Sequence, residues 1–232
     1  MPIRKWSVFH ALPVLLFASS LAAQDAAVDQ GSFRVLVEGR AAGSEEFSIR
    51  QSGSGTSSEV TAVGRIEVTL PTGTLELTPR LRARGVEASP VAYQVDIGGD
   101  SPRKIIGTVG SGRVSTRIIS SIGEQLREYV ASAGAVVLDE GVAHHYYFLA
   151  QRQRNGTVPV IIPRENRQVV ATVSDRGEER VEIEGTPLNL FHLVVQVPGA
   201  SERHVWVDAL NRVIRVRIPE RGYEAVRTAI PR

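Results

Sequence analysis

The sequence of 232 residues contains no cysteine. This absence excludes disulfide bonds, thiolate metal sites and cysteine nucleophiles, and it also excludes lipid attachment to an N-terminal cysteine. The chain also has almost no excess of basic over acidic residues. Arg4 and Lys5 account for the formal net charge of +2, so the rest of the chain carries as many acidic as basic residues. A chain without a basic field has no electrostatic footprint for nucleic acid, and we expect no nucleic-acid partner.

Sequence motifs for catalysis are also lacking. The chain has no G-x-S-x-G nucleophile elbow and no H-E-x-x-H zinc motif. Residues 107–112 are rich in glycine but lack both the spacing and the following helix of a dinucleotide-binding loop. We therefore expect a protein that is not an enzyme, with no catalytic residues and no cofactor.

The histidines offer only a weak case for a metal site. His144 and His145 are adjacent, and neighbouring residues of a helix point about 100° apart, so the pair cannot hold one ion from one face. His192 and His204 could meet in space, but a histidine that is satisfied within the structure is the more common case. We predict no metal site.

The N-terminal segment has the three-part pattern of a secretory signal peptide. The basic pair at residues 4–5 precedes a mostly apolar run, Val8–Ala18, and small residues follow at 19–23. The run is shorter than the roughly 20 residues that cross a membrane as a helix. We expect residues 1–24 to be removed on export to the periplasm or the extracellular space, leaving no transmembrane segment. The alternative is an uncleaved membrane anchor.

Residues 25–232 read as one domain built almost entirely of β-strands. Short segments alternate apolar and polar residues: Phe47 and Ile49 share one face of a strand, while Glu46 and Ser48 share the other. Short turns between successive segments favour antiparallel neighbours. The count reaches about a dozen strands, at which an open sheet has to curl or close. The fold class we predict is mainly β, a curved antiparallel sheet or half-open β-barrel.

Residues 141–154 are predicted to form the one central helix. Asp139 can cap its start, and Asn155-Gly156 can end it. At helical spacing Val142, Tyr146, Leu149 and Ala150 form one apolar stripe, while Phe148 points the other way. A helix that is apolar nearly all round is usually covered on both sides. Two arrangements satisfy this pattern: the helix lies in the concavity of a curled sheet, or it packs on one sheet face with Phe148 under a loop.

Three segments carry a resemblance to known proteins. Residues 33–49, with Phe33, Val35 and Phe47 on either side of a turn that contains Gly39 and Gly43, resemble the opening hairpin of exported bacterial proteins of unknown function. Residues 136–149 resemble their central helix region, and residues 204–218 resemble their closing hairpin. The closing hairpin is also similar to that of the periplasmic lipoprotein carriers of the Lol type. This resemblance implies a curved, half-open antiparallel barrel with an apolar cavity, although the chain departs from the carriers in having only one long helix.

Two functions follow as expectations. The first is binding of an apolar ligand, such as a lipid or acyl chain, in the curved sheet; its candidate lining is Tyr146, Phe148, Phe191 and Trp206. The second is a non-enzymatic structural or interaction protein of the cell envelope, whose partner is another envelope protein and whose interior is filled by its own side chains. The first requires a hollow concave face and the second a filled one.

Overall fold

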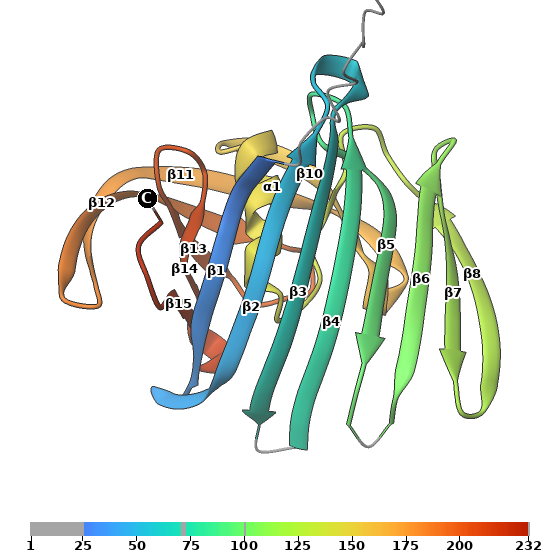
Figure 1. Ribbon diagram of the computed structural model, residues 1–232, viewed down its shortest axis with the longest axis horizontal. Coiled ribbons are helices and arrows are strands. Elements are labelled where there is room, and N and C mark those ends of the chain that lie inside the picture. The colour runs from blue at the N-terminus through green and yellow to red at the C-terminus, as the bar shows by residue number, and fades with distance from the viewer. Residues whose placement is uncertain (1–25, 71–72, 100, 232) are drawn as a thin grey trace, which may run out of the picture.

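The protein forms one mainly antiparallel sheet of 15 strands that curls around a short helix (Figure 1). The computed structural model describes residues 26–70, 73–99 and 101–231, so the predicted signal peptide, 1–24, lies outside the described residues. The strands are β1 (Ala26–Val37), β2 (Arg40–Ser52), β3 (Glu59–Leu70), β4 (Gly73–Arg84), β5 (Ser89–Ile97), β6 (Arg103–Gly110), β7 (Arg113–Ser120), β8 (Gly123–Val130), β9 (Val136–Val137), β10 (Gly156–Ile162), β11 (Arg167–Ile183), β12 (Thr186–Gln196), β13 (Arg203–Val207), β14 (Val213–Ile218) and β15 (Tyr223–Arg227).

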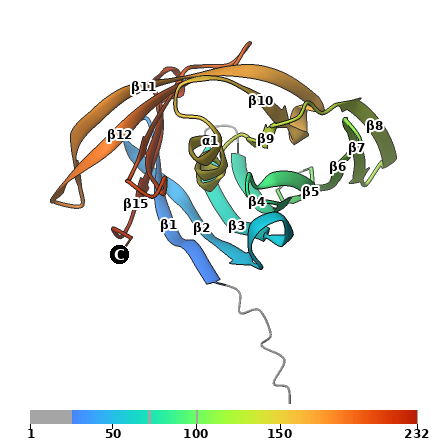
Figure 2. The same cartoon turned by 90° about the horizontal axis from the view of Figure 1, so that it is seen from above.

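The topology is a continuous meander with one long-range closure. Each strand pairs with the next along the chain from β1 to β8 and from β10 to β15, and β1 pairs with β15, so β8 and β9 form the two edges. All pairs are antiparallel except β9 with β10. Seen from above, the wall from β1 to β8 and the wall from β10 to β12 enclose the helix α1 (Figure 2). The predicted curved antiparallel sheet is confirmed.

Alternation of side chains explains why these segments are strands with one buried face. In β4, Leu77, Leu81 and Ala83 point into the core, while Arg80 and Arg84 are exposed. Burying one such aliphatic side chain contributes about 1.5–3 kcal/mol. A sheet of this length therefore gains most of its stability from the apolar row on its concave face.

The helix is shorter than the predicted 141–154. The α-helix α1 covers only Tyr146–Arg152, and a 3-10 turn, η2 (Ala143–His145), precedes it. Gly141 has a φ of +73°, which no helix allows, and the Asp139 carboxylate does not cap the helix. After Gln153 the chain is already extended and enters β10. The predicted bounds were therefore wrong at both ends.

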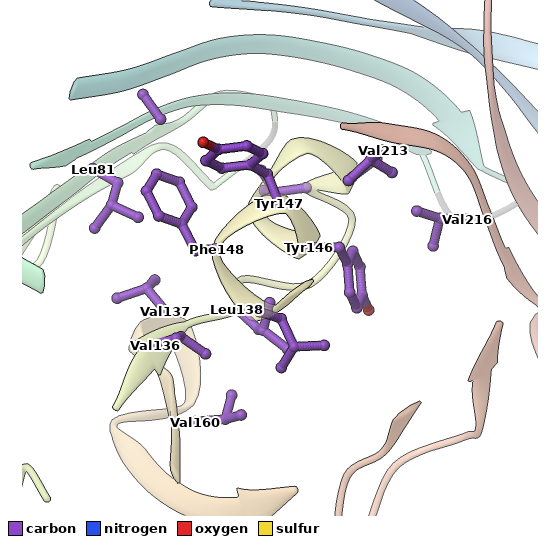
Figure 3. Close-up of a cluster of buried hydrophobic side chains, with 14 of the residues drawn as sticks. Leu81, Val136, Val137, Leu138, Tyr146, Tyr147, Phe148, Val160, Val213 and Val216 are labelled. Carbon is purple, nitrogen blue, oxygen red and sulfur yellow. The ribbon is translucent and has the colours of Figure 1, made fainter. Parts of the chain in front are cut away.

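The helix lies in the concavity of the sheet, as the first of the two arrangements requires. All side chains from Tyr146 to Ala150 are buried. Phe148 points toward Leu81 of β4, and Tyr146 points the other way, toward Val216 of β14 (Figure 3). No helix among residues 26–70, 73–99 and 101–231 combines the length and the apolar character needed to cross a membrane.

A second, smaller core lies on the other face of the sheet. The outer part of the hairpin β11–β12 covers β13, β14 and β15 there, and an ion pair of 2.6 Å between Arg34 and Glu184 holds its tip to β1. Val205 and Val207 face the main core, so Trp206 between them faces this second cluster. The cluster consists of Val181, Ile183, Leu190, Trp206 and Ile214.

The remaining short elements are 3-10 turns in the connections. Two of them, η3 (Pro163–Glu165) and η4 (Pro219–Arg221), begin with proline and are followed by a residue in the left-handed conformation, which turns the chain back into the next strand. The third of these turns is η1 (Gly55–Ser57).

Candidate functional site

The concave face of the sheet is filled rather than hollow. At the η2 end of α1 the free space amounts to about 20 Å³, lined by Leu138, Tyr146, Val160 and Val216 among others, while a pocket of about 330 Å³ lies at the other end of the helix, next to Gln151. A cavity needs roughly 10–15 Å³ to hold one water molecule, so the space at the η2 end is of the size of one water. The interior therefore has no room for a lipid beside η2 and the first turn of α1.

Glu45 fixes the turn η2 inside the barrel. Its carboxylate is fully buried and accepts hydrogen bonds from the backbone N–H groups of Ala143 and His144, both at 2.8 Å. The ring Nδ1 of His144 lies 2.7 Å from the same carboxylate. One acidic side chain of β2 thus satisfies three donors of a turn that lies far away in the sequence.

The ring of His144 fits into a space that a glycine leaves open. It stacks on Phe47 with centroids 5.3 Å apart and an interplanar angle of 2°. A Cβ atom on Gly64 of β3 would lie 2.7 Å from Cε1 of this ring. Glycine at position 64 is therefore required by close packing, not by a turn.

A buried arginine closes the seam between the first and last strands. Arg227 of β15 forms an ion pair with Asp29 of β1, and its Nε donates to the carbonyl oxygen of Val213 at 2.7 Å. Its guanidinium lies over the ring of Phe47, 4.5 Å from the centroid. Burial raises the pKa of Asp29, and the charge of Arg227 opposes that shift. The ion pair thus links β1 to β15 inside the seam.

The other side of η2 contains a second buried polar group. The hydroxyl of Tyr93 donates to Asp139 at 2.5 Å, and Arg164 Nε donates to the same carboxylate at 2.6 Å. The backbone N–H of Asp139 donates to Nδ1 of His145 at 3.2 Å, so the His145 ring is neutral. Burial raises the pKa of Tyr93 well above 10.0, with Asp139 contributing further.

We predict that His145 makes the protein less stable in mild acid. Complete burial lowers its pKa well below 6.5, and the neighbouring His144 and Arg164 add to the shift. Below pH 6.5 the unfolded chain binds a proton that the folded state refuses, so stability falls as the pH falls, by about 1.4 kcal/mol per unit. Urea unfolding at pH 7.5 and 5.5 should therefore show a loss about 1 kcal/mol larger for the natural protein than for His145→Asn. Equal losses in the two proteins would contradict this.

A pocket of about 180 Å³ opens at one end of the half-barrel, where five strands begin or end. Its walls are mostly apolar, and Val68 and Ile218 are buried in them. We call it the rim pocket. It is lined by Val37, Val68, Leu70, Leu75, Glu140, Gly141, Arg164, Ile218, Arg221 and Tyr223.

The polar groups at the rim pocket include the carboxylate of Glu140 and the phenol of Tyr223. Arg221 forms an ion pair with Glu140, and Arg203 lies 3.7 Å from the same carboxylate. The hydroxyl of Tyr223 is buried and has no hydrogen-bond partner among the described residues. Burial raises its pKa well above 10.0, with Glu45 adding to the shift, so the hydroxyl keeps its proton. It is an unused donor beside an apolar pocket.

The four residues predicted to line a ligand site are not brought together. Tyr146 borders the small cavity next to the rim pocket, and burial raises its pKa to about 12. Phe148 is packed in the main core. Phe191 lies beneath the guanidinium of Arg154, 4.2 Å away, and Trp206 belongs to the cluster on the opposite face. Whether any of them binds a ligand stays a prediction.

His192 and His204 do meet, as a hydrogen-bonded pair on the outer face. Nε2 of His192 lies 2.9 Å from Nδ1 of His204, and Glu179 and Glu202 lie 3.1 Å and 3.2 Å from their other ring nitrogens. Glu179 also accepts the indole N–H of Trp206 at 2.8 Å. The part of the chain that the structure describes holds no group of three or more His, Cys, Asp or Glu side chains able to bind a metal.

Sequence reasoning missed the rim pocket itself. Leu70 is the last residue of β3 and Leu75 lies near the start of β4. Both are apolar although they lie away from the middle of the core. That placement was the only available signal. Ile218 and Tyr223 join them only because β15 pairs with β1, a contact that spans almost the whole sequence.

Comparison with known proteins gives little further information. No protein-family model matches the sequence, and no curated protein is similar to it. Among solved structures, the chain is similar to a beta-barrel-like protein of the domain of unknown function DUF1849 from Brucella abortus. The two share 8% identity over 85% of this chain and 93% of that chain, with a TM-score of 0.49. A likeness at this level carries no argument about function, and the resemblance to Lol-type carriers stays a sequence-based prediction.

Proposed function

We propose that this is an exported, non-enzymatic protein of the cell envelope that binds a small apolar group in its rim pocket. Export rests on the signal-peptide pattern of residues 1–24. The observation that carries the binding function is the apolar pocket of about 180 Å³ at the open end, beside the unpartnered hydroxyl of Tyr223. The filled interior argues against a carrier that encloses a whole lipid.

The size of the pocket limits the ligand. Sites for drug-sized molecules usually measure about 300–1,000 Å³, so 180 Å³ takes only part of an acyl chain. Burying about five methylene groups contributes about 4 kcal/mol, at about 0.8 kcal/mol each. An affinity for the chain alone is then in the millimolar range. Such weak binding suits a site that engages one end of a lipid still held elsewhere.

Methyl NMR during a titration with octyl glucoside, kept below its micelle concentration, tests the proposal. We expect shifts at Val68, Leu75 and Ile218 and none at Leu81. Leu75→Glu should abolish the shifts, because it places a charge in the apolar wall. Leu210→Glu is the control, since Leu210 is exposed and lies outside the pocket. The proposal fails if the titration moves no rim methyl, or if Leu75→Glu leaves the response intact.

A second function is favoured by the edge of the sheet. β8 pairs on one side only with β7, and Ile122, Leu126 and Val130 at this edge are 90%, 71% and 66% exposed. Exposed apolar residues on an unpaired edge suit binding of an envelope protein as an added strand. Crosslinking from position 126 in intact cells tests this function, and recovery of no crosslinked protein would count against it.

A further inference from the structure

A second pocket lies next to the rim pocket and differs from it in character. It measures about 370 Å³ and is lined by residues where β6 begins, β7 ends and β8 begins. These strand ends lie at the same end of the sheet as the rim (Figure 1). We call it the polar pocket. Arg164 lines both pockets and therefore stands between them. The polar pocket is lined by Ser101, Pro102, Arg103, Ile105, Ile118, Ser120, Ser121, Ile122, Gln125, Arg164 and Asn166.

The charges of the polar pocket favour an anion. Its described lining contains two arginines and no carboxylate. Arg103 is exposed and has no ion-pair partner among the described residues, so its guanidinium is available. Arg164, by contrast, is only 14% exposed and is held in place by Asp139 at 2.6 Å. One arginine is thus free to bind, and the other is fixed as a wall of both pockets.

The polar pocket also contains neutral hydrogen-bonding groups. The side-chain oxygen of Asn166 is buried and accepts no hydrogen bond from the described residues. Asn166 follows η3 and has a left-handed backbone conformation, with a φ of 53°. The hydroxyls of Ser101 and Ser121 and the amide of Gln125 border the same space. The amide oxygen of Asn166 can only accept, so water is its partner, whereas the two hydroxyls and the amide N–H groups of Gln125 can donate to an anionic head.

We propose that the rim pocket and the polar pocket form one site for a single-chain amphiphile with an anionic head. The end of the acyl chain lies against Val68 and Leu75, and the head lies at Arg103, with Arg164 between them. This inference rests on the function proposed above, because the chain half of the site is the rim pocket. The head half is an addition, argued from different residues.

The alternative explanation is that Arg103 is only a solvent-exposed charge at the start of β6 and binds no ligand. In that case, replacing Arg103 would change the affinities for anionic, neutral and cationic ligands by the same factor. A head-binding arginine acts on anionic ligands alone, and its effect weakens with added salt. These two behaviours are separated by comparing ligands that share a chain and differ in the head.

The test compares octanoate, octyl phosphate, octyl glucoside and octyltrimethylammonium by methyl NMR at low ionic strength. We expect the two anions to bind at least 10-fold more tightly than octyl glucoside, and the cation to bind no better than octyl glucoside. Arg103→Glu should remove the preference for the anions over octyl glucoside, and Arg103→Gln should reduce it. Arg65→Glu, the same charge change on an exposed residue outside both pockets, is the matched control.

The outcomes separate the two proposals. Equal affinities for all four heads, or an anion preference that survives Arg103→Glu, would overturn the head site and leave the rim pocket standing. Absence of binding by every probe would overturn both. Tighter binding of octyl phosphate than of octanoate assigns the head to a lysophospholipid, and the reverse order assigns it to a free fatty acid; either order supports an anionic head.

Discussion

Replacing Glu45 with alanine is expected to lower the free energy of unfolding by at least about 3 kcal/mol, because each buried donor left unpaired costs about 1–3 kcal/mol. The carboxylate is the acceptor for two backbone N–H groups and for the His144 ring, all within 2.8 Å. Without it, these donors stay buried and unpaired, because the space beside η2 is of the size of a single water. Urea unfolding monitored by circular dichroism measures the loss.

The adjacent residue supplies the control for this measurement. Glu46 has the same side chain but is exposed on the opposite face of β2. Glu46→Ala should change the free energy of unfolding by less than about 0.5 kcal/mol, as most surface substitutions do. Equal effects at positions 45 and 46 would show that the acid inside the barrel does not hold η2.

Replacing Gly43 with alanine is expected to cost about 3 kcal/mol, near the upper end for overpacking. A Cβ atom at this position would lie 1.9 Å from the carbonyl oxygen of Glu67 and 2.8 Å from Cα of Val68. Both atoms belong to the backbone of β3, so no side-chain rotation relieves the contact. β2 and β3 must separate at the rim, and the melting temperature measures the result.

A matched glycine checks that the cause is steric. Gly110 lies at the end of β6, has no atom within 4 Å of its would-be Cβ and has an ordinary φ. Gly110→Ala should therefore leave the melting temperature nearly unchanged. If Gly43→Ala is equally harmless, β2 and β3 are further apart at the rim than the structure places them. Because Val68 lines the rim pocket, Gly43→Ala should also weaken octyl glucoside binding.

The sheet could be predicted from the sequence because its signal is local. Alternation within a strand and short turns between strands are visible over a few residues, and they give antiparallel neighbours without further information. Phe47 and Ile49 were assigned to one face and are both buried, while Glu46 on the other face is exposed. The curl follows from the number of strands.

The ends of the helix could not be predicted, because a distant residue decides them. Asp139 has the side chain of a helix cap, but Tyr93 and Arg164 use its carboxylate. The acceptor for the first N–H groups of η2 is instead Glu45, which lies 98 residues from Ala143 in the sequence. Local capping rules cannot identify an acceptor supplied by another strand.

The candidate site was missed for the same reason. Aromatic residues were chosen as its lining because they carry the largest apolar surface, yet Phe148 fills the core and Trp206 serves the outer cluster. The rim pocket is instead built from aliphatic residues at strand ends, such as Leu70 and Leu75. Their convergence depends on strand register and on the β1–β15 closure, neither of which the sequence alone specifies.

The central claim is that the interior is filled and that the ligand binds at the open end. A crystal structure with 8-bromooctanoate, in which anomalous scattering locates the bromine, tests it most directly. The account predicts bromine beside Val68 and Leu75, with the carboxylate near Arg103. Bromine beside Phe148 and Leu81, inside the barrel, would contradict the account.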